Sequence, residues 1–333
     1  MNDTLAPTPK LRIWQQNVNR SLTSHLHVLN SADPSEIDIL AFQEPHLDFQ
    51  HKSRASYHWH SVYPTPFKHS GPRARSLLLI SRHIPTARWE ILLIDSNDIT
   101  AIRLVGETQD IVLFNIYNDC NPRYDHTLRT IRSSFRSLQR TSQRTTFSIL
   151  IGDFNRHHPM WDEERNHHLF TTVNLNASQT LINLLADYDL SMILPPRIPT
   201  LEALNSGNFT RVDNVFASSD LIPLFDVCNT VPEWRPPLTD HLPIYSVLDF
   251  EMERVRETKK WNWKNVDWEE FREALQEELI HLGAPRNITS VAEFDRALAL
   301  LNQAVTTVIE RLVKELRITP FTKRWWNSEL EKK

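Results

Sequence analysis

The sequence predicts an α/β fold in which a mixed β-sheet system is covered by helices and followed by an α-helical extension. Three observations predict it. Short β-rich runs recur as far as residue 250, amphipathic helical segments lie among them, and the pattern becomes helical beyond residue 255. Many strands with a few helices between them are typical of sheets with helices outside. The 333 residues, 40% of them hydrophobic, suit one large domain plus an appendage.

A series of apolar runs has the length and composition of β-strands. They are rich in the branched and aromatic residues that favour extended backbone. In chain order they cover residues 11–14, 37–42, 76–81, 91–94, 99–105, 111–116, 148–151, 212–216 and 243–250. Helices are expected where apolar residues recur at intervals of three and four. These segments cover residues 21–30, 125–141 and 178–188.

Two further helices are predicted after residue 255. Asp267 with Glu270, and Ser290 with Glu293, have the spacing of capping boxes. The second helix then carries apolar residues spaced alternately by three and four as far as Leu312. Such a seam needs a partner helix, which the first helix can supply. We therefore expect a helical hairpin.

Composition excludes several classes of protein. Two cysteines, Cys120 and Cys228, argue against a disulfide framework or a cysteine zinc site. The sequence has no Gly-rich phosphate loop, which argues against nucleotide binding of the Walker or Rossmann kind. It has neither a secretory leader nor eighteen consecutive apolar residues, so we expect a soluble intracellular protein with no membrane partner.

The net charge of −4 conceals a basic stretch. Residues 49–89 contain no Asp or Glu, but seven Lys and Arg and five His. Since a polyanion responds to the local field, we expect this stretch, with Arg73 in it, to contact phosphates. A second basic row, residues 129–140, lies beside an apolar row at helical spacing, and we interpret it as a solvated helix face.

Polar side chains border the apolar runs at their ends. Residues 149–155, ILIGDFN, end in Asp153 and Asn155. A Gly-Asp pair alone is also a common turn. Other runs are bordered in the same way by Asn17, Glu44, Tyr117 with Asn118, and Asp240 with His241. Several such termini can build a site at the strand ends, where α/β enzymes keep their chemistry.

These side chains suit phosphoester hydrolysis. Glu44, Asn17 and Asp240 offer oxygen ligands only, the set preferred by Mg²⁺, or Mn²⁺ in its place, and not by zinc. A separate acid, Asp213, can hold the imidazole of His241 in one tautomer. We expect Asp153 to orient or deprotonate the attacking water, while Asn155 and Tyr117 donate hydrogen bonds to the phosphate.

Each residue also has a simpler explanation. A glutamate after a strand is usually a surface residue, and an isolated Asp-His pair is usually a cap or a salt bridge. His157 and His158 are neighbours on an extended segment and point to opposite sides, so we treat them as loop structure or substrate contacts and not as metal ligands. The thiol of Cys120 has nothing near it in sequence that would activate it.

Taken together, these residues resemble the endonuclease/exonuclease/phosphatase superfamily over residues 10–250. Residues 155–161, NRHHPMW, and 240–244, DHLPI, are most similar to endonuclease domains of non-LTR (LINE-type) retrotransposons. The resemblance implies a four-layer sandwich of two packed mixed β-sheets flanked by helices. It leaves the helical hairpin at residues 255–318 and a tail, residues 319–333, that resembles the connector toward a reverse transcriptase.

The resemblance also assigns roles to residues. It implies that Asn17, Glu44 and Asp240 gather around the metal, and that Asp213 orients His241. It implies substrate contacts for Asn118 and for Thr200, which stands where a DNA-contacting threonine is expected.

The chain departs from the superfamily pattern in two places. Asn214 follows Asp213 where an apolar residue is usual, which bears on how firmly Asp213 is held. Asn19 replaces an acid of apurinic endonucleases, which disfavours abasic-site repair.

We therefore expect a Mg²⁺-dependent endonuclease that nicks one strand of double-stranded DNA in the nucleus. The nick would leave the 3′-hydroxyl that primes reverse transcription, with the reverse transcriptase region of the same element as a partner. No polymerase motif follows, so we expect a fragment or a lone nicking module. Two alternatives stay open: a phosphatase of a lipid or small phosphoester, and a catalytically inactive DNA-binding or assembly module.

Overall fold

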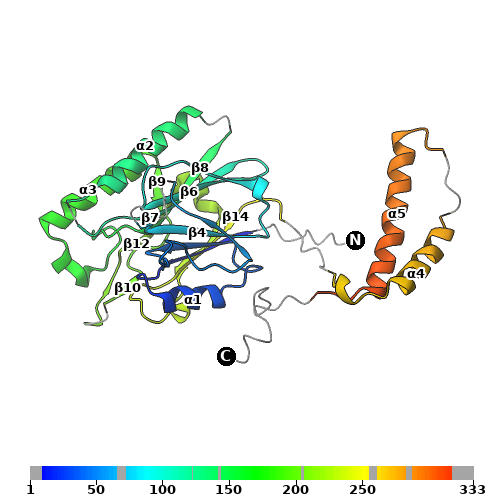
Figure 1. Cartoon of the computed structure of the whole chain (residues 1–333). Coiled ribbons are helices and arrows are strands. Elements are labelled where there is room, and N and C mark those ends of the chain that lie inside the picture. The colour runs from blue at the N-terminus through cyan, green and yellow to red at the C-terminus, as the bar shows by residue number, and fades with distance from the viewer. Residues whose placement is uncertain are drawn as a thin grey trace, which may run out of the picture. The chain divides into compact units, whose positions relative to one another are not determined.

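The computed structural model describes residues 10–65, 73–121, 123–141, 144–203, 206–254, 261–282 and 287–316. The chain divides into two compact units, Met1–Val255 and Arg256–Lys333. Among these described residues, the first unit contains the sheets and three α-helices, and the second contains two α-helices (Figure 1).

The first sheet has six strands in the order β13-β14-β1-β2-β4-β3. β1 pairs parallel with β2 and antiparallel with β14, and it aligns Asn17 with Gln43. The chain therefore leaves β1 and β2 at the same edge of the sheet. The strands are β1 (Lys10–Asn17), β2 (Ile39–Gln43), β3 (Trp59–Val62), β4 (Ser76–Ser81), β13 (Phe225–Thr230) and β14 (Ile244–Asp249).

The second sheet also has six strands, in the order β5-β6-β7-β8-β12-β9. β7 and β8 are parallel and the other pairs are antiparallel, so both sheets are mixed. The strands are β5 (Trp89–Ile91), β6 (Ile99–Val105), β7 (Asp110–Tyr117), β8 (Thr146–Asp153), β9 (Leu190–Met192) and β12 (Asp213–Ser218).

The two sheets pack face to face, and each is covered by helices on its outer face. Successive side chains of β7 and β8 alternate between the two buried layers: Leu113 and Ile149 face the other sheet, whereas Phe114 and Leu150 face the helices. Because both faces are buried, these strands carry unbroken apolar runs, residues 111–114 of β7 and 149–151 of β8. Figure 1 shows α2 (His126–Thr141) and α3 (Thr172–Asp187) on one side and α1 (Leu22–Ser31) on the other. The four-layer sandwich is confirmed.

Short elements complete the unit. A two-stranded sheet pairs β10 (Leu201–Glu202) with β11 (Phe209–Thr210). Short 3₁₀ helices cover Thr86–Arg88, Glu164–Leu169, Ser219–Leu224 and Pro232–Trp234, and a fifth, in the second unit, covers Trp263–Asn265. Among the described residues, no helix combines the length and apolar character needed to cross a membrane.

The strand expected at residues 91–94 was wrong in position. The strand is β5, which ends at Ile91, and Leu93 beyond it is largely exposed. Strands β3, β9 and β13 were not expected. β3 and β13 are the outermost strands of their sheet, and a half-exposed edge strand needs no apolar run.

The second unit is a pair of capped helices, α4 (Trp268–Ile280) and α5 (Val291–Leu312). Both expected caps are confirmed: Asp267 accepts hydrogen bonds from the backbone of Glu269 and Glu270, and Ser290 accepts one from Glu293. Phe271 and Ala274 of α4 pack with Val308 of α5.

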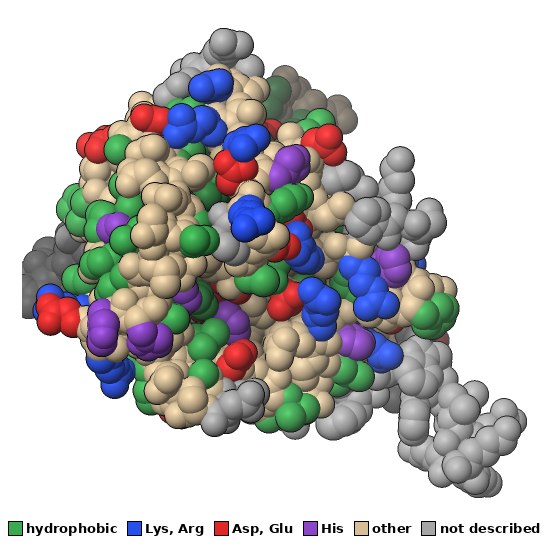
Figure 2. Space-filling model, turned by 90° about the vertical axis from the view of Figure 1, so that its left-hand side faces the viewer, with side chains coloured by type: hydrophobic (Ala, Val, Ile, Leu, Met, Phe, Trp, Pro, Cys, Tyr) green, Lys and Arg blue, Asp and Glu red, His purple; other side chains and the backbone are tan. Residues whose placement is uncertain are grey.

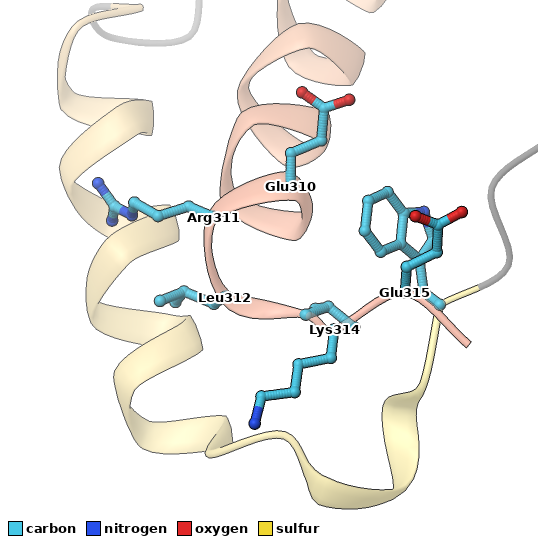
Figure 3. A pocket seen from close by; sticks show the side chains of 7 residues that line it. Glu310, Arg311, Leu312, Lys314 and Glu315 are labelled. Carbon is cyan, nitrogen blue, oxygen red and sulfur yellow. The ribbon is translucent and has the colours of Figure 1, made fainter. Parts of the chain in front are cut away.

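The seam of α5 is only half covered. Its last turns face α4, and Figure 3 shows Arg311 and Leu312 directed toward that helix. Since α5 has 22 residues and α4 has 13, the first turns of α5 extend past it. Val291 is 77% exposed there and Phe294 51%. The expected tail at residues 319–333 lies outside the described residues.

Candidate active site

Three of the expected site residues lie in one row across the second sheet. The register pairs Tyr117 with Asp153 on β7 and β8, and Asp153 with Asp213 on β12. Gly152 makes this approach of strands possible. Its φ is +146°, and a Cβ there would lie 1.9 Å from the carbonyl oxygen of Ile116 on β7. Glycine is therefore required directly before Asp153.

His241 completes the row from the loop before β14. Its Nδ1 lies 2.8 Å from Oδ2 of Asp213, and both residues are buried. The carboxylate can only accept, so Nδ1 carries the proton of this hydrogen bond. The other ring nitrogen, Nε2, lies 3.9 Å from Oδ2 of Asp153 and 3.8 Å from Oδ1 of Asp240. Asp213 thus fixes the ring with Nε2 facing the other acids.

The charges of this cluster shift the acid–base equilibria of its members. Burial lowers the pKa of His241, but the charge and hydrogen bond of Asp213, with the charges of Asp153 and Asp240, outweigh it and raise the pKa to about 10. Burial raises the pKa of Asp153, and repulsion by Asp213 raises it further. Negative charge is therefore concentrated where Nε2 points.

Asn17 links the first sheet to this cluster. Its Nδ2 donates to Oδ2 of Asp153 over 3.0 Å, and its Oδ1 accepts the backbone N–H of Asn19 over 2.9 Å. The hydroxyl of Thr239 donates to the Asn17 carbonyl over 2.8 Å. The end of β1 is thereby joined both to β8 and to the loop that carries Asp240.

Glu44 follows β2 directly and has a left-handed backbone, with φ of +45°. A conformation that costs free energy in most residues persists only where neighbours impose it. Here the Glu44 carbonyl accepts the N–H of Arg20, and its side chain pairs with the Arg20 guanidinium. Burial raises the pKa of Tyr117, and the charges of Glu44 and Asp153 raise it further. The charge of Glu44, which follows a strand of the first sheet, therefore acts on Tyr117 at the end of β7 in the second sheet.

Asn118 and Asn155 hold together the two loops that follow β7 and β8. The Asn155 side chain donates to the Asn118 carbonyl over 2.8 Å, and the Asn118 side chain donates to the Phe154 carbonyl over 2.8 Å. The backbone N–H of Asn155 also donates to Oδ1 of Asp153 over 3.0 Å. Asn118 is fully buried and supports the structure of these loops, and the substrate contact expected of its side chain stays a prediction.

Thr200 is also enclosed by its surroundings. It has no exposed surface, and its Oγ1 accepts the backbone N–H groups of Val212, over 3.2 Å, and Asp213, over 3.0 Å. A hydroxyl enclosed in this way positions the start of β12, and the DNA contact expected of Thr200 stays a prediction. Arg73, by contrast, is exposed and makes no hydrogen bond or ion pair with the other residues that the structure describes.

The structure also explains the asparagine after Asp213. The Oδ1 of Asn214 accepts a hydrogen bond from Nε of Arg211 over 2.9 Å. Arg211 is itself buried and donates to the carbonyl of Leu194 over 2.8 Å. The residue that departs from the superfamily pattern is therefore part of a buried polar network that holds β12 near its start.

Arg156 was missed as a structural residue by the sequence reasoning. It is buried, and its guanidinium donates to three backbone carbonyls, those of Asp119, Asn155 and Tyr124, over 2.8–3.0 Å. A guanidinium has donors enough to satisfy several loop carbonyls at once. Its place directly after the Gly-Asp-Phe-Asn motif was the one sequence signal, but two of its partners, Asp119 and Tyr124, come from another loop.

The basic stretch is not one continuous phosphate-binding surface. Arg75 and Arg88 are ion-paired with carboxylates of other segments, and Lys68 lies outside the described residues. Figure 2 shows the face that carries β10, where Lys and Arg side chains are interspersed with Asp, Glu and His. Arg73 remains an exposed cation of this stretch.

The cluster has the chemistry of a cation site. Ligand atoms of Asp153, Asp213 and His241 lie within 4.8 Å of one another. Asn17 and Asp240 contact members of this cluster and add oxygen atoms, which suit a hard divalent cation. Burial and the charge of Asp213 both raise the pKa of Asp153, and a bound cation would oppose them by favouring the charged carboxylate. These residues therefore fit such an ion.

Comparison with known proteins agrees with this geometry. A family model described as endonuclease-reverse transcriptase matches residues 111–245, a range that includes Tyr117, Asp153, Asp213 and His241. Comparison with curated protein sequences gave no significant match.

Solved structures share the fold. The endonuclease domain of TRAS1, a telomere-specific non-LTR retrotransposon, has 16% identity and a TM-score of 0.55, covering 72% of this chain and 98% of that one. An AP endonuclease from Archaeoglobus fulgidus has 20% identity and a TM-score of 0.54, covering 72% and 99%. The AP endonuclease LMAP from Leishmania major has 14% identity and a TM-score of 0.57, covering 72% and 88%. These likenesses establish the fold, and together with the family model they bear out the resemblance drawn from the motifs.

Proposed function

We propose that this chain, whose first unit has the fold of the endonuclease/exonuclease/phosphatase superfamily, is a metal-dependent endonuclease that nicks double-stranded DNA. The observation that carries the proposal is the buried row of Tyr117, Asp153 and Asp213 with His241 held against it. A histidine fixed by one acid and facing a second acid is the arrangement that phosphoester hydrolysis needs.

The proposed reaction assigns a task to each side chain. Asp153, held by Asn17 and the Asn155 backbone, orients the attacking water and accepts its proton. His241, fixed by Asp213, directs Nε2 to the phosphate and stabilises its developing charge. Water adds to phosphorus and the P–O3′ bond breaks. The leaving oxygen takes up a proton and becomes a 3′-hydroxyl, and the other fragment keeps a 5′-phosphate.

The ligands that we propose for Mg²⁺, or Mn²⁺, are Glu44, Asn17 and Asp240. When bound, the ion would polarise the phosphorus centre and neutralise charge on the leaving oxygen. Metal dependence also follows from the superfamily resemblance. This ligand set stays a prediction, as do action inside the nucleus and a role in priming reverse transcription of a non-LTR retrotransposon.

The test is nicking of supercoiled plasmid in Mg²⁺, with and without a chelator. Chelator-sensitive open circles are expected. A DNA polymerase with labelled nucleotides should then extend the nick directly, because only a 3′-hydroxyl can be extended. Intact supercoils with DNA retained by the protein would favour an inactive binding module, and hydrolysis of small phosphoesters alone would favour a phosphatase.

Glu44→Gln tests the metal ligands. It removes a charge but keeps the size of the side chain, and we expect a loss of about a thousandfold in rate, or roughly 4 kcal/mol. Glu253→Gln is the control, because Glu253 is a surface carboxylate paired with Arg88. If Glu44→Gln stayed within about tenfold of the wild-type rate, Glu44 would not be a ligand.

A further inference from the structure

Arg75 makes an unusual set of contacts beside the proposed active site. It lies in the loop before β4 with a side chain that is 25% exposed. Its Nε and Nη2 donate to the two oxygens of Asp98 over 2.6 and 2.7 Å, and its Nη1 donates to Asp119 over 2.8 Å. Two carboxylates therefore neutralise this guanidinium, which distinguishes it from the exposed Arg73 in the same loop.

The same guanidinium covers the ring of Tyr117. Its Cζ lies 4.7 Å from the ring centroid, a cation–π distance. Asp98, which holds the guanidinium, also accepts the backbone N–H of Tyr117 through its carbonyl over 2.9 Å. Arg75 and Asp98 thus fix Tyr117 by its ring face and by its backbone.

The backbone of Arg75 reaches the first sheet. Its carbonyl accepts the N–H of Glu44 over 2.8 Å, at the left-handed residue that follows β2. The next residue, Ser76, pairs with Gln43 of β2 and donates its hydroxyl to the Asn115 carbonyl of β7 over 2.8 Å. Arg75 is therefore joined to Glu44 from the first sheet and to Tyr117 from the second.

We propose that Arg75 is a positioning residue that sets Glu44 and Tyr117 in the relative placement that catalysis requires. The catalytic part of this inference rests on the proposed function, whereas the joining of two sheet edges rests on the contacts alone. The planar guanidinium meets Asp98, Asp119 and the Tyr117 ring at once. A lysine has neither the fork nor the flat face for this.

A positioning arginine and a phosphate-binding arginine fail in different ways. Loss of positioning lowers the rate of the bound complex, because reacting groups misplaced by about 1 Å can cost roughly a hundredfold. Loss of a phosphate contact instead weakens DNA binding and makes its salt dependence shallower. Arg75, with its donors given to carboxylates, is expected to show the first behaviour.

The experiment compares the wild-type protein with Arg75→Met, Arg75→Lys and the control Arg88→Met, each made in the full-length chain. Arg88 has the same exposure, 25%, and also contacts two carboxylates, those of Glu107 and Glu253. Asp98 directly precedes the first residue of β6, whereas Glu107 lies beyond its last residue, at the other end of the strand. The contact of Arg88 with Glu107 is therefore away from the proposed active site. Thermal unfolding confirms that each variant is folded.

In nicking assays, Arg75→Met should lower kcat roughly a hundredfold while KM, DNA affinity and salt slope change by no more than about twofold. Arg75→Lys should be only partly active, and Arg88→Met should match wild type. An unchanged kcat for folded Arg75→Met would overturn the proposal. So would a loss confined to salt-dependent DNA affinity.

A second measurement needs no nuclease activity. Hydrogen exchange by mass spectrometry reports the amides of Glu44 and Tyr117, whose acceptors are the carbonyls of Arg75 and Asp98. Exchange should accelerate in both peptides of Arg75→Met and in neither peptide of Arg88→Met. If amide exchange accelerates in Arg75→Met but the wild-type protein does not nick DNA, the proposed endonuclease function is rejected and the joining role of Arg75 is supported. Unchanged exchange in both peptides would reject the joining role, whatever the activity.

Discussion

The hydroxyl oxygen of Thr200 lies 3.0 Å from the backbone nitrogen of Asp213, the acid that holds His241. Thr200 accepts the N–H of Val212 as well and has no exposed surface. Its influence on DNA cleavage would therefore pass through the position of Asp213.

Thr200→Val tests that influence. The change leaves two buried N–H groups without an acceptor, and we expect a loss of about 2 kcal/mol in the free energy of unfolding. The nicking rate should fall about tenfold with unchanged DNA affinity. Urea unfolding and a binding titration measure both. Thr200→Ser keeps the hydroxyl and should match wild type. If Thr200→Val instead bound DNA more weakly at unchanged stability, Thr200 would contact DNA directly.

Asp213→Asn should disable the histidine without disturbing the fold. An amide can donate to Nδ1 and favour the wrong tautomer, and we expect a loss of roughly 10³- to 10⁴-fold in single-turnover nicking. Without the charge of Asp213, burial should also lower the pKa of His241. The control is Asp220→Asn, at an exposed position in the helix after β12. An activity of Asp213→Asn equal to that of the control would separate Asp213 from the mechanism.

Arg73→Ala should affect binding and not the chemical step. Because Arg73 is exposed and free of partners among the described residues, it is expected to meet a phosphate. The slope of log affinity against log salt should become shallower by about one, with the saturated rate unchanged. Arg103→Ala is a control, since Arg103 is already paired with Glu90 over 2.7 Å. Equal affinities of Arg73→Ala and wild type at low salt would show that Arg73 does not touch DNA.

His25 predicts a loss of stability in mild acid. Burial lowers its pKa to about 4, although the hydrogen bond to the Arg54 carbonyl opposes the change. The unfolded chain therefore takes up the proton first, near pH 6.5. Stability from the neutral ring is complete above that pH and is lost as the pH falls toward 4. Between pH 7 and 5 this residue should remove about 2 kcal/mol of unfolding free energy.

Urea unfolding at both pH values measures this loss. His25→Gln should lack that part of the pH dependence, while His27→Gln, at an exposed position on the same helix, should keep it. If the two variants lost equal stability between pH 7 and 5, the assignment to His25 would be refuted.

The sequence was sufficient where a signal is local. Strands buried on both faces, such as β7 and β8, carry unbroken apolar runs. The caps at Asp267 and Ser290 depend on residues two or three positions away. Polar residues at strand ends could likewise be identified as site candidates. The short strand β9 and the edge strands β3 and β13 carry no such signal.

The roles of several residues depend on partners distant in the chain. The sequence around Thr200 does not predict that its hydroxyl accepts a hydrogen bond from the backbone of Asp213. In the sequence, Arg75 is one of several cations in the basic stretch. Only the folded structure shows that it pairs with Asp98 and Asp119. In each case the residue type was informative, but its contact was fixed by packing of the two sheets.

The row of Tyr117, Asp153 and Asp213 has a consequence for how such a domain can diversify. Their alignment is set by backbone pairing inside the sheet, while loops begin directly beyond the row, at Asn118 after β7 and at Phe154 after β8. Exchanging or lengthening those loops would alter what the protein recognises and leave the reacting groups aligned. A single deletion within β8 would instead turn every following side chain to the opposite face. The loops that would recognise a substrate can therefore change without moving the side chains that would react with it.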